Sequence, residues 1–64
     1  MGNKEKFFIF LLENYARKKN TSAEAVFDEW GKKGVTQYIY DMYERYHQEA
    51  IENAYEDIER VCNN

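Results

Sequence analysis

The sequence lacks most of the residues that interrupt helices or cross-link small proteins. It has 64 residues with no proline, three glycines, one cysteine and one histidine. Past the N-terminus only Gly31 and Gly34 punctuate the chain, which favours helix almost throughout. A single cysteine, Cys62, excludes a disulfide framework and is typical of a reducing compartment.

Long apolar runs are also missing. The run Phe7–Leu12 is too short to span a bilayer and is not followed by a small-residue cleavage site. We therefore expect a cytoplasmic protein that makes no membrane contact, with residues 1–64 forming a single domain.

Basic residues are scarce in the second half of the chain. Residues 1–36 hold seven Lys/Arg and five Asp/Glu, a charge of +2, whereas residues 37–64 hold two and seven, a charge of −5. The basic spots, residues 17–19 and 32–33, lie where helix C-termini favour cations. Because nucleic-acid binders usually present a dense basic face, we expect no specific nucleic-acid binding.

Large aromatic rings are the abundant feature. Six tyrosines, four phenylalanines and one tryptophan are many rings for so short a chain to bury. Excess apolar surface on a small soluble domain usually marks contact with a partner.

The spacing of apolar residues predicts four helical segments. The first is about Lys4–Lys19, after which Asn20 leaves the helix, and the second is about Ser22–Trp30. Thr21 with Glu24 fits a capping box, and Gly34 is a plausible left-handed stop.

The remaining segments are about Thr36–Gln48 and about Ala50–Val61. No glycine or proline separates His47 from Ile51, so the joint is either a break or a bend in one helix. The predicted fold is all-α, a compact bundle of three to four helices. The predicted core, one stripe per helix, is Phe8, Leu11, Leu12, Tyr15, Phe27, Trp30, Ile39, Met42, Tyr43, Tyr55 and Ile58.

Two aromatic residues do not fit these stripes. Phe10 lies beside Lys6, Glu13 and Arg17, on the polar side of the first helix, and Tyr40 lies opposite Tyr38. Phe10 and Tyr40 are therefore the candidate interaction surface, unless the bundle wraps around both.

No residue pattern predicts catalysis, metal binding or a cofactor. His47 lacks the further ligands that a metal needs and an oriented partner for general-base chemistry. Cys62 falls on an apolar stripe, as a buried inert thiol does. Glu56 and Asp57 are adjacent, so on a helix they point about 100° apart and cannot act as a paired acid and base.

A helix-turn-helix arrangement is the alternative hypothesis. The second segment, the turn at residues 31–34 and the third segment have its proportions. However, the supposed recognition helix contains Asp41 and Glu44 against Arg45 as its only base, which opposes phosphate binding.

The chain also resembles a bacterial family of short helical proteins of unknown function, over most of its length. The matching features, in order, are Glu13-Asn14-Tyr15-Ala16, Ser22 with Ala25 and Phe27, Lys33-Gly34-Val35, Tyr38, Tyr43, His47 and Glu56-Asp57-Ile58. Members are often encoded beside predicted ADP-ribosyltransferase-like toxin proteins. The family often has a glycine after the histidine, where this chain has Gln48-Glu49-Ala50. The resemblance implies an accessory or antitoxin-like role and no catalytic residues.

Together these observations predict a non-enzymatic protein–protein interaction module, working through a protein partner or self-association as a homodimer. A DNA-binding regulator of the helix-turn-helix kind is the alternative.

Overall fold

The computed structural model describes residues 2–63, and that range contains five helices and no strand. The all-α class is confirmed. The number of helices exceeds the three to four predicted, because the third predicted segment is divided in two. The helices are α1 (Asn3–Lys18), α2 (Ala23–Lys33), α3 (Thr36–Asp41), α4 (Tyr43–Gln48) and α5 (Ile51–Cys62).

Helix α1 has a defined start and stop. At its start, the backbone N–H of Gly2 donates to Glu5 Oε2 at 2.8 Å. At its end, Asn20 leaves the helix as expected, with a left-handed φ of 59°. The N–H of Thr21 then donates to the carbonyl of Ala16 at 2.9 Å, which closes the last turn.

Helix α2 begins one residue later than the predicted capping box. The N-cap is Ser22, whose hydroxyl accepts from the N–H of Ala25 at 3.1 Å, so the assignment of Thr21 and Glu24 as cap pair is wrong. The backbone of Ser22 is extended, the conformation that an N-cap requires. The helix ends at Gly34, whose φ of 70° confirms the predicted left-handed stop.

The two glycines of this segment give a matched stability test. A Cβ on either would meet no atom within 4 Å, but only Gly34 has a positive φ. Gly34→Ala should therefore lower the free energy of unfolding by about 1–2 kcal/mol. Gly31→Ala lies inside the helix and should raise it by about 0.5–1 kcal/mol. Urea denaturation of both variants measures the difference, and equal effects would contradict the left-handed stop.

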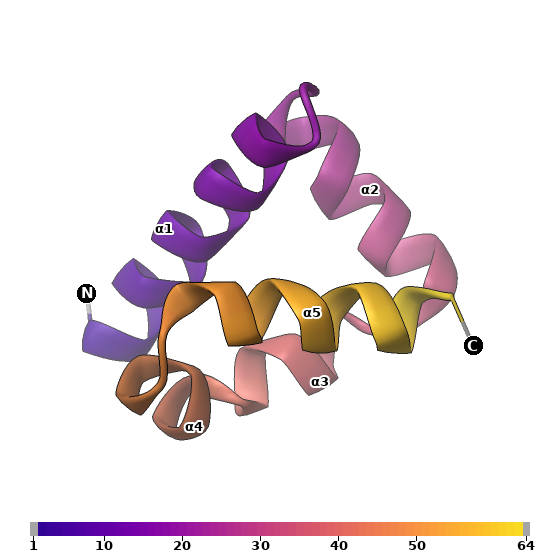
Figure 1. The fold of residues 1–64 in the computed structure, drawn as a ribbon. Coiled ribbons are helices and arrows are strands. Elements are labelled where there is room, and N and C mark those ends of the chain that lie inside the picture. The colour runs from indigo at the N-terminus through magenta and orange to yellow at the C-terminus, as the bar shows by residue number, and fades with distance from the viewer. Residues whose placement is uncertain (1, 64) are drawn as a thin grey trace.

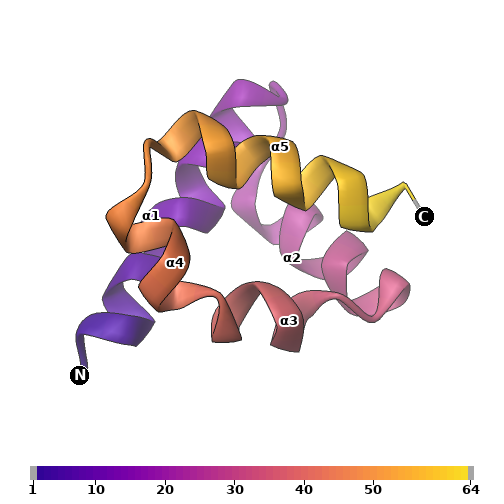
Figure 2. The same cartoon turned by 60° about the horizontal axis from the view of Figure 1, so that its bottom comes forward.

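The predicted third helix, Thr36–Gln48, is interrupted at Met42. This residue has φ −83° and ψ 13°, and its N–H lies 3.1 Å from the carbonyl of Tyr38 and 3.2 Å from that of Ile39. The chain therefore turns tightly between α3 and α4, as Figure 2 shows. The change of direction lets α3 bury Ile39 while α4 buries Tyr46.

The joint between α4 and α5 is a break. Glu49 and Ala50 are extended, with ψ values of 169° and 143°, and neither is a glycine or proline. Arg45 Nε lies 3.6 Å from Glu49 Oε2, which holds the end of α4 to the connection.

The helices enclose one core. In Figure 1, α1 and α2 form a V, α3 and α4 return across its open end, and α5 crosses the V. Helix α1 packs against α2, α3 and α4, and α5 packs against α4. Lys33 Nζ donates to the carbonyl of Cys62 at 2.9 Å, joining the ends of α2 and α5. The radius of gyration, 10.8 Å, is that of a closely packed chain of this length.

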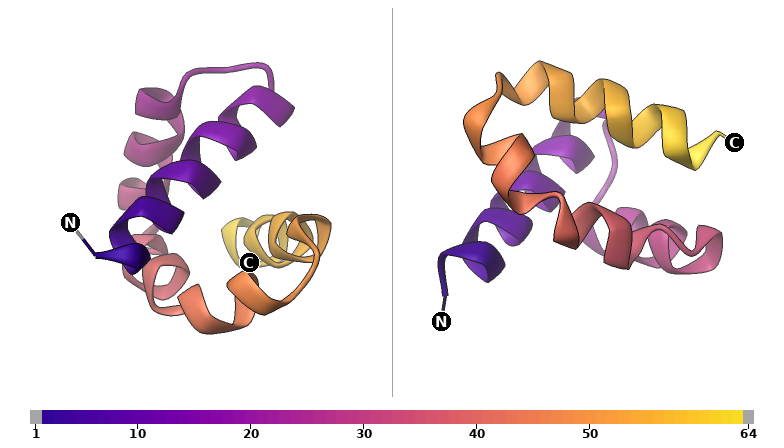
Figure 3. Two further views of the ribbon diagram at one scale, coloured as in Figure 1. Left: turned by 90° about the vertical axis from the view of Figure 1, so that its left-hand side faces the viewer. Right: turned by 90° about the horizontal axis from the view of Figure 1, so that it is seen from below.

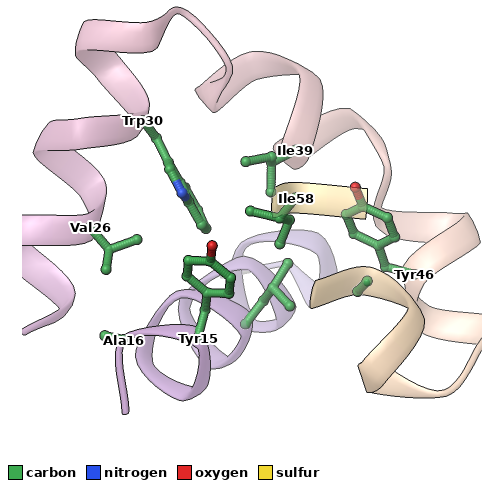
Figure 4. Close-up of a cluster of buried hydrophobic side chains, with 9 residues drawn as sticks. Tyr15, Ala16, Val26, Trp30, Ile39, Tyr46 and Ile58 are labelled. Atoms are coloured by element: carbon green, nitrogen blue, oxygen red, sulfur yellow. The ribbon is translucent and has the colours of Figure 1, made fainter. Parts of the chain in front are cut away.

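The core forms where the five helices meet (Figure 4). Among the predicted core residues, Leu11, Tyr15, Trp30, Ile39 and Ile58 are buried, and Phe8, Leu12, Met42, Tyr43 and Tyr55 are half-buried. The prediction is wrong for Phe27, which is 50% exposed. Val26, Tyr46 and Ala54 lie on the apolar stripes of their helices and are also buried, whereas the burial of Ala16 was not predicted.

Candidate interaction surface

The side of α1 that faces away from the core carries two large apolar side chains. Ile9 is 43% exposed and Phe10 is 50% exposed. Lys6 and Glu13 flank them and are also exposed, so the four follow at i, i+3, i+4 and i+7 and form one stripe. We call these four residues the α1 outer face. In the left panel of Figure 3, α1 lies in front and no other helix crosses it.

The exposure expected of Phe10 is thus observed, and its position is fixed by the helix. Its backbone carbonyl accepts from Asn14 Nδ2 at 2.7 Å, and its ring centroid lies 6.2 Å from that of Phe7. The buried side of α1, with Leu11 and Tyr15, packs the core without it. Phe10 therefore presents a half-exposed ring outside the buried core.

Sequence reasoning missed Ile9. It belongs to the apolar run Phe7–Leu12, of which we assigned only Phe10 to the polar side of the helix. The available signal is the spacing of Ile9 and Phe10 from Lys6 and Glu13, which places both apolar residues in a polar stripe.

Tyr40 is less accessible than Phe10. Its hydroxyl donates to Glu5 Oε1 at 2.6 Å, and its ring lies 5.6 Å from Phe8, edge to face. Lys4 Nζ covers the ring at 4.6 Å from the centroid. The hydrogen bond from Tyr40, followed by that from Gly2, lowers the pKa of Glu5. These contacts occupy Tyr40 within the chain, so its contact with a partner stays a prediction.

His47 packs in a cluster of rings between α1 and α4. Its ring centroid lies 5.2 Å from Tyr43 and 5.7 Å from Phe7, and those two rings are 5.5 Å apart. The imidazole is exposed and no hydrogen bond is found for it within residues 2–63. An imidazole held this way acts as a packing residue at the end of α4.

A second exposed phenylalanine borders a shallow groove on α2. Phe27 lies edge to face with Phe8 at 6.4 Å. The groove has a volume of about 620 Å³ and is open to solvent; its lining residues are Ser22, Glu24, Ala25, Phe27, Asp28, Gly31 and Lys32. These residues all come from α2 and its N-cap, so the groove lacks the convergent groups of a small-molecule site.

Asp57 accepts hydrogen bonds from three side chains, more than any other side chain of the part of the chain that the structure describes. It accepts from Tyr46 Oη at 2.6 Å and from Tyr38 Oη at 2.9 Å, and it pairs with Arg60. Burial alone would raise the pKa of Asp57, but the hydrogen bonds from Tyr46, Arg60 and Tyr38 outweigh it and lower the pKa. The pKa of Tyr46 is raised mainly by burial and secondly by its hydrogen bond to Asp57. These hydrogen bonds join α3 and α4 to α5. The neighbouring residue Glu56 is exposed and takes no part in them.

The remaining titratable residues show no reactive arrangement. Cys62 is half-buried, and burial raises the pKa of its thiol, which disfavours the nucleophilic thiolate. Among residues 2–63, no three His, Cys, Asp or Glu side chains lie close enough together to hold a metal ion.

Several basic residues of the two spots are engaged within the chain. Lys19 pairs with Glu59, Lys32 Nζ lies 3.2 Å from Asp28, and Lys33 Nζ lies 3.5 Å from Glu29. These ion pairs neutralise part of the charge that phosphate would need.

The helix-turn-helix alternative gains nothing from the geometry of α3. Its supposed recognition helix has only six residues before the turn at Met42. Gln37, on its exposed side, donates to Asp41 Oδ1 at 3.0 Å, so its amide is engaged by a carboxylate, which repels phosphate.

No helix within residues 2–63 has the length and apolar character needed to cross a membrane.

Comparison with models of protein families identifies the family of this chain. Searches of curated proteins and of solved structures find no match. A model of a protein family described as "Protein of unknown function (DUF3791)" matches residues 6–64, nearly the whole chain. The chain therefore belongs to this DUF3791 family of proteins of unknown function.

Proposed function

We propose that this protein is a non-enzymatic protein–protein interaction module that binds through the α1 outer face. The observation that carries the proposal is the pair of exposed side chains, Ile9 and Phe10, side by side on an ordered helix. Neither residue belongs to the buried core, and about half of each is left exposed to water. Adjacent apolar side chains rimmed by charges are typical of a surface that a partner covers.

The titratable residues support a binding role over a catalytic one. Asp57, the carboxylate with the most partners, is occupied by Tyr38, Tyr46 and Arg60 in bonds that join helices. His47 packs against rings, and within residues 2–63 no carboxylate is found in hydrogen-bond or ion-pair contact with it.

We extend the proposal to a role as an accessory or antitoxin-like component of a bacterial toxin cassette. Its support is the resemblance described above, which is a gene-neighbourhood association and supplies no contact residue. Purification of the tagged chain from its natural host, followed by mass spectrometry, tests this part. A co-purifying toxin-like protein is the expected result, and its consistent absence would remove the extension.

The binding surface itself is tested by a photo-cross-linking residue placed at position 10. Phe27 offers a matched control because it is also a phenylalanine, 50% exposed, on another helix. In host cells, we expect the residue at position 10 to give a discrete cross-linked protein band and the residue at position 27 to give little. Equal yields at both positions, or no band from position 10, would contradict the proposed surface.

A further inference from the structure

We infer that the α1 outer face binds a second copy of this chain, with the two α1 helices packed antiparallel across a two-fold axis. This inference deepens the proposed function and rests on it, because it names the occupant of the same surface. Its basis is the order of the four side chains along the helix: a cation, two apolar residues and an anion.

The order makes the face complementary to itself. With the two-fold axis between residues 9 and 10, Ile9 of each copy meets Phe10 of the other at the centre. Lys6 of each copy then lies level with Glu13 of the other, since both are equally far from the axis. One antiparallel register therefore forms an apolar centre and two identical ion pairs, the pattern of an isologous dimer interface.

The charges also select the orientation. Two parallel α1 helices related by a two-fold axis would bring Lys6 against Lys6 and Glu13 against Glu13. Like charges placed opposite each other suppress an arrangement, whereas opposite charges fix its register. Of the two arrangements, only the antiparallel one places Lys6 and Glu13 of each copy opposite a residue of the other sign.

These two charges have no ion-pair partner within residues 2–63. By contrast, two cations at or beside the ends of α1 do pair inside the fold: Lys4 Nζ lies 3.6 Å from Asp41 Oδ1, and Lys19 pairs with Glu59. Lys6 and Glu13 are seven residues apart, too far along one helix to pair with each other. A second copy supplies each with its opposite charge.

The size of the face sets the expected strength. Helix α1 has 16 residues, a length of about 24 Å. One such helix from each copy buries less than the roughly 1,200 Å² at which stable interfaces begin, so the dimer belongs to the weak, transient class. We expect a dissociation constant on the order of micromolar to tens of micromolar.

Charge reversal gives the test. The variants Lys6→Glu and Glu13→Lys each place two like-charge pairs in the dimer, one at each end of the apolar centre. Sedimentation equilibrium on the full chain should show the dissociation constant raised about tenfold or more for each variant alone. An equimolar mixture of the two should form a heterodimer of wild-type strength. In that heterodimer one chain carries two acids on the α1 outer face and the other carries two bases, so each acid meets a base.

Two further samples exclude trivial explanations. Glu24→Lys makes the same change in net charge as Glu13→Lys at an exposed position on α2, and it should dimerise like the wild type. Circular dichroism should show unchanged helix content in every variant, since all three positions are exposed. A wild type that stays monomeric up to roughly 1 mM would overturn the inference. So would single reversals that dimerise normally, or a mixture that fails to recover.

The cross-linking experiment separates this inference from the proposed function. A band from position 10 that contains only this chain supports both. A band that contains a different protein overturns the second copy as the occupant and leaves the interaction module standing. No band from position 10, with a monomeric wild type, overturns both.

Discussion

Replacing Trp30 with alanine should remove most of the stability of this domain. The indole is fully buried, and it packs against the rings of Phe8 at 5.9 Å and Tyr15 at 5.8 Å between centroids. Loss of a buried tryptophan side chain lowers the free energy of unfolding by about 3–5 kcal/mol. A domain of 64 residues has roughly 3–10 kcal/mol in total. Thermal denaturation followed by circular dichroism should show Trp30→Ala largely unfolded or cooperatively melting at a much lower temperature.

Phe27→Ala is the matched control, since it removes a ring from the same helix. Because Phe27 is half exposed and Trp30 is fully buried, Phe27→Ala should lower the free energy of unfolding by less than half as much as Trp30→Ala does. A shift of only a degree or two for Trp30→Ala, or equal shifts for both variants, would contradict the burial of the two rings described above.

The contrast between Trp30 and Phe27 shows how far periodicity could take the prediction. The spacing of Val26, Phe27 and Trp30 defines one side of α2, and that side does face the core. Phe27 stands at its edge, and whether an edge is covered depends on where the other helices lie. They cover Val26 and Trp30 and leave Phe27 half exposed, a consequence of tertiary packing that spacing within one helix cannot predict.

The helix boundaries show a similar limit. Gly34 was predictable as the end of α2 because a helix commonly ends at a residue with a left-handed backbone, and glycine adopts that conformation most easily. The turn at Met42 carries no glycine or proline, so the sequence predicted one unbroken helix there. The joint near Glu49 and Ala50 was located between two predicted helices, but without a glycine or proline the choice between a break and a bend stayed open. Burial of Ile39 from α3 and of Tyr46 from α4 is the tertiary constraint that accompanies the turn at Met42.

The candidate surface was partly predictable for the same reason. Phe10 breaks the polar side of α1, and a break in a helical pattern can be detected from sequence alone. Tyr40 likewise lies outside the apolar stripe of its helix, yet its hydroxyl donates a hydrogen bond to Glu5, 35 residues away in the chain. Contacts at such separations depend on the packing of whole helices, so the same pattern led to an exposed residue in one case and a bonded one in the other.

Asp57→Ala should produce the largest loss of stability among the polar substitutions. It removes the acceptor of Tyr46 Oη and Tyr38 Oη and the partner of Arg60. Tyr46 is 2% exposed, so its hydroxyl would lose its acceptor in a place that water reaches poorly. We expect the free energy of unfolding at pH 7 to fall by about 1.5–3 kcal/mol, the range for hydrogen bonds to a charged group. Glu56→Ala, at the exposed neighbouring position, should change it by less than about 0.5 kcal/mol.

The same carboxylate should give the stability an acid dependence. Because folding lowers the pKa of Asp57 below its ordinary value of 3.8, the folded state holds fewer protons there than the unfolded state. Its contribution is therefore complete above that value and is lost as the pH falls through the lower folded pKa. Urea denaturation at several pH values below about 4 should show a smaller decline for Asp57→Ala than for the wild type. Parallel declines, or a Glu56→Ala variant that loses as much stability as Asp57→Ala, would show that Asp57 does not hold α3 and α4 to α5.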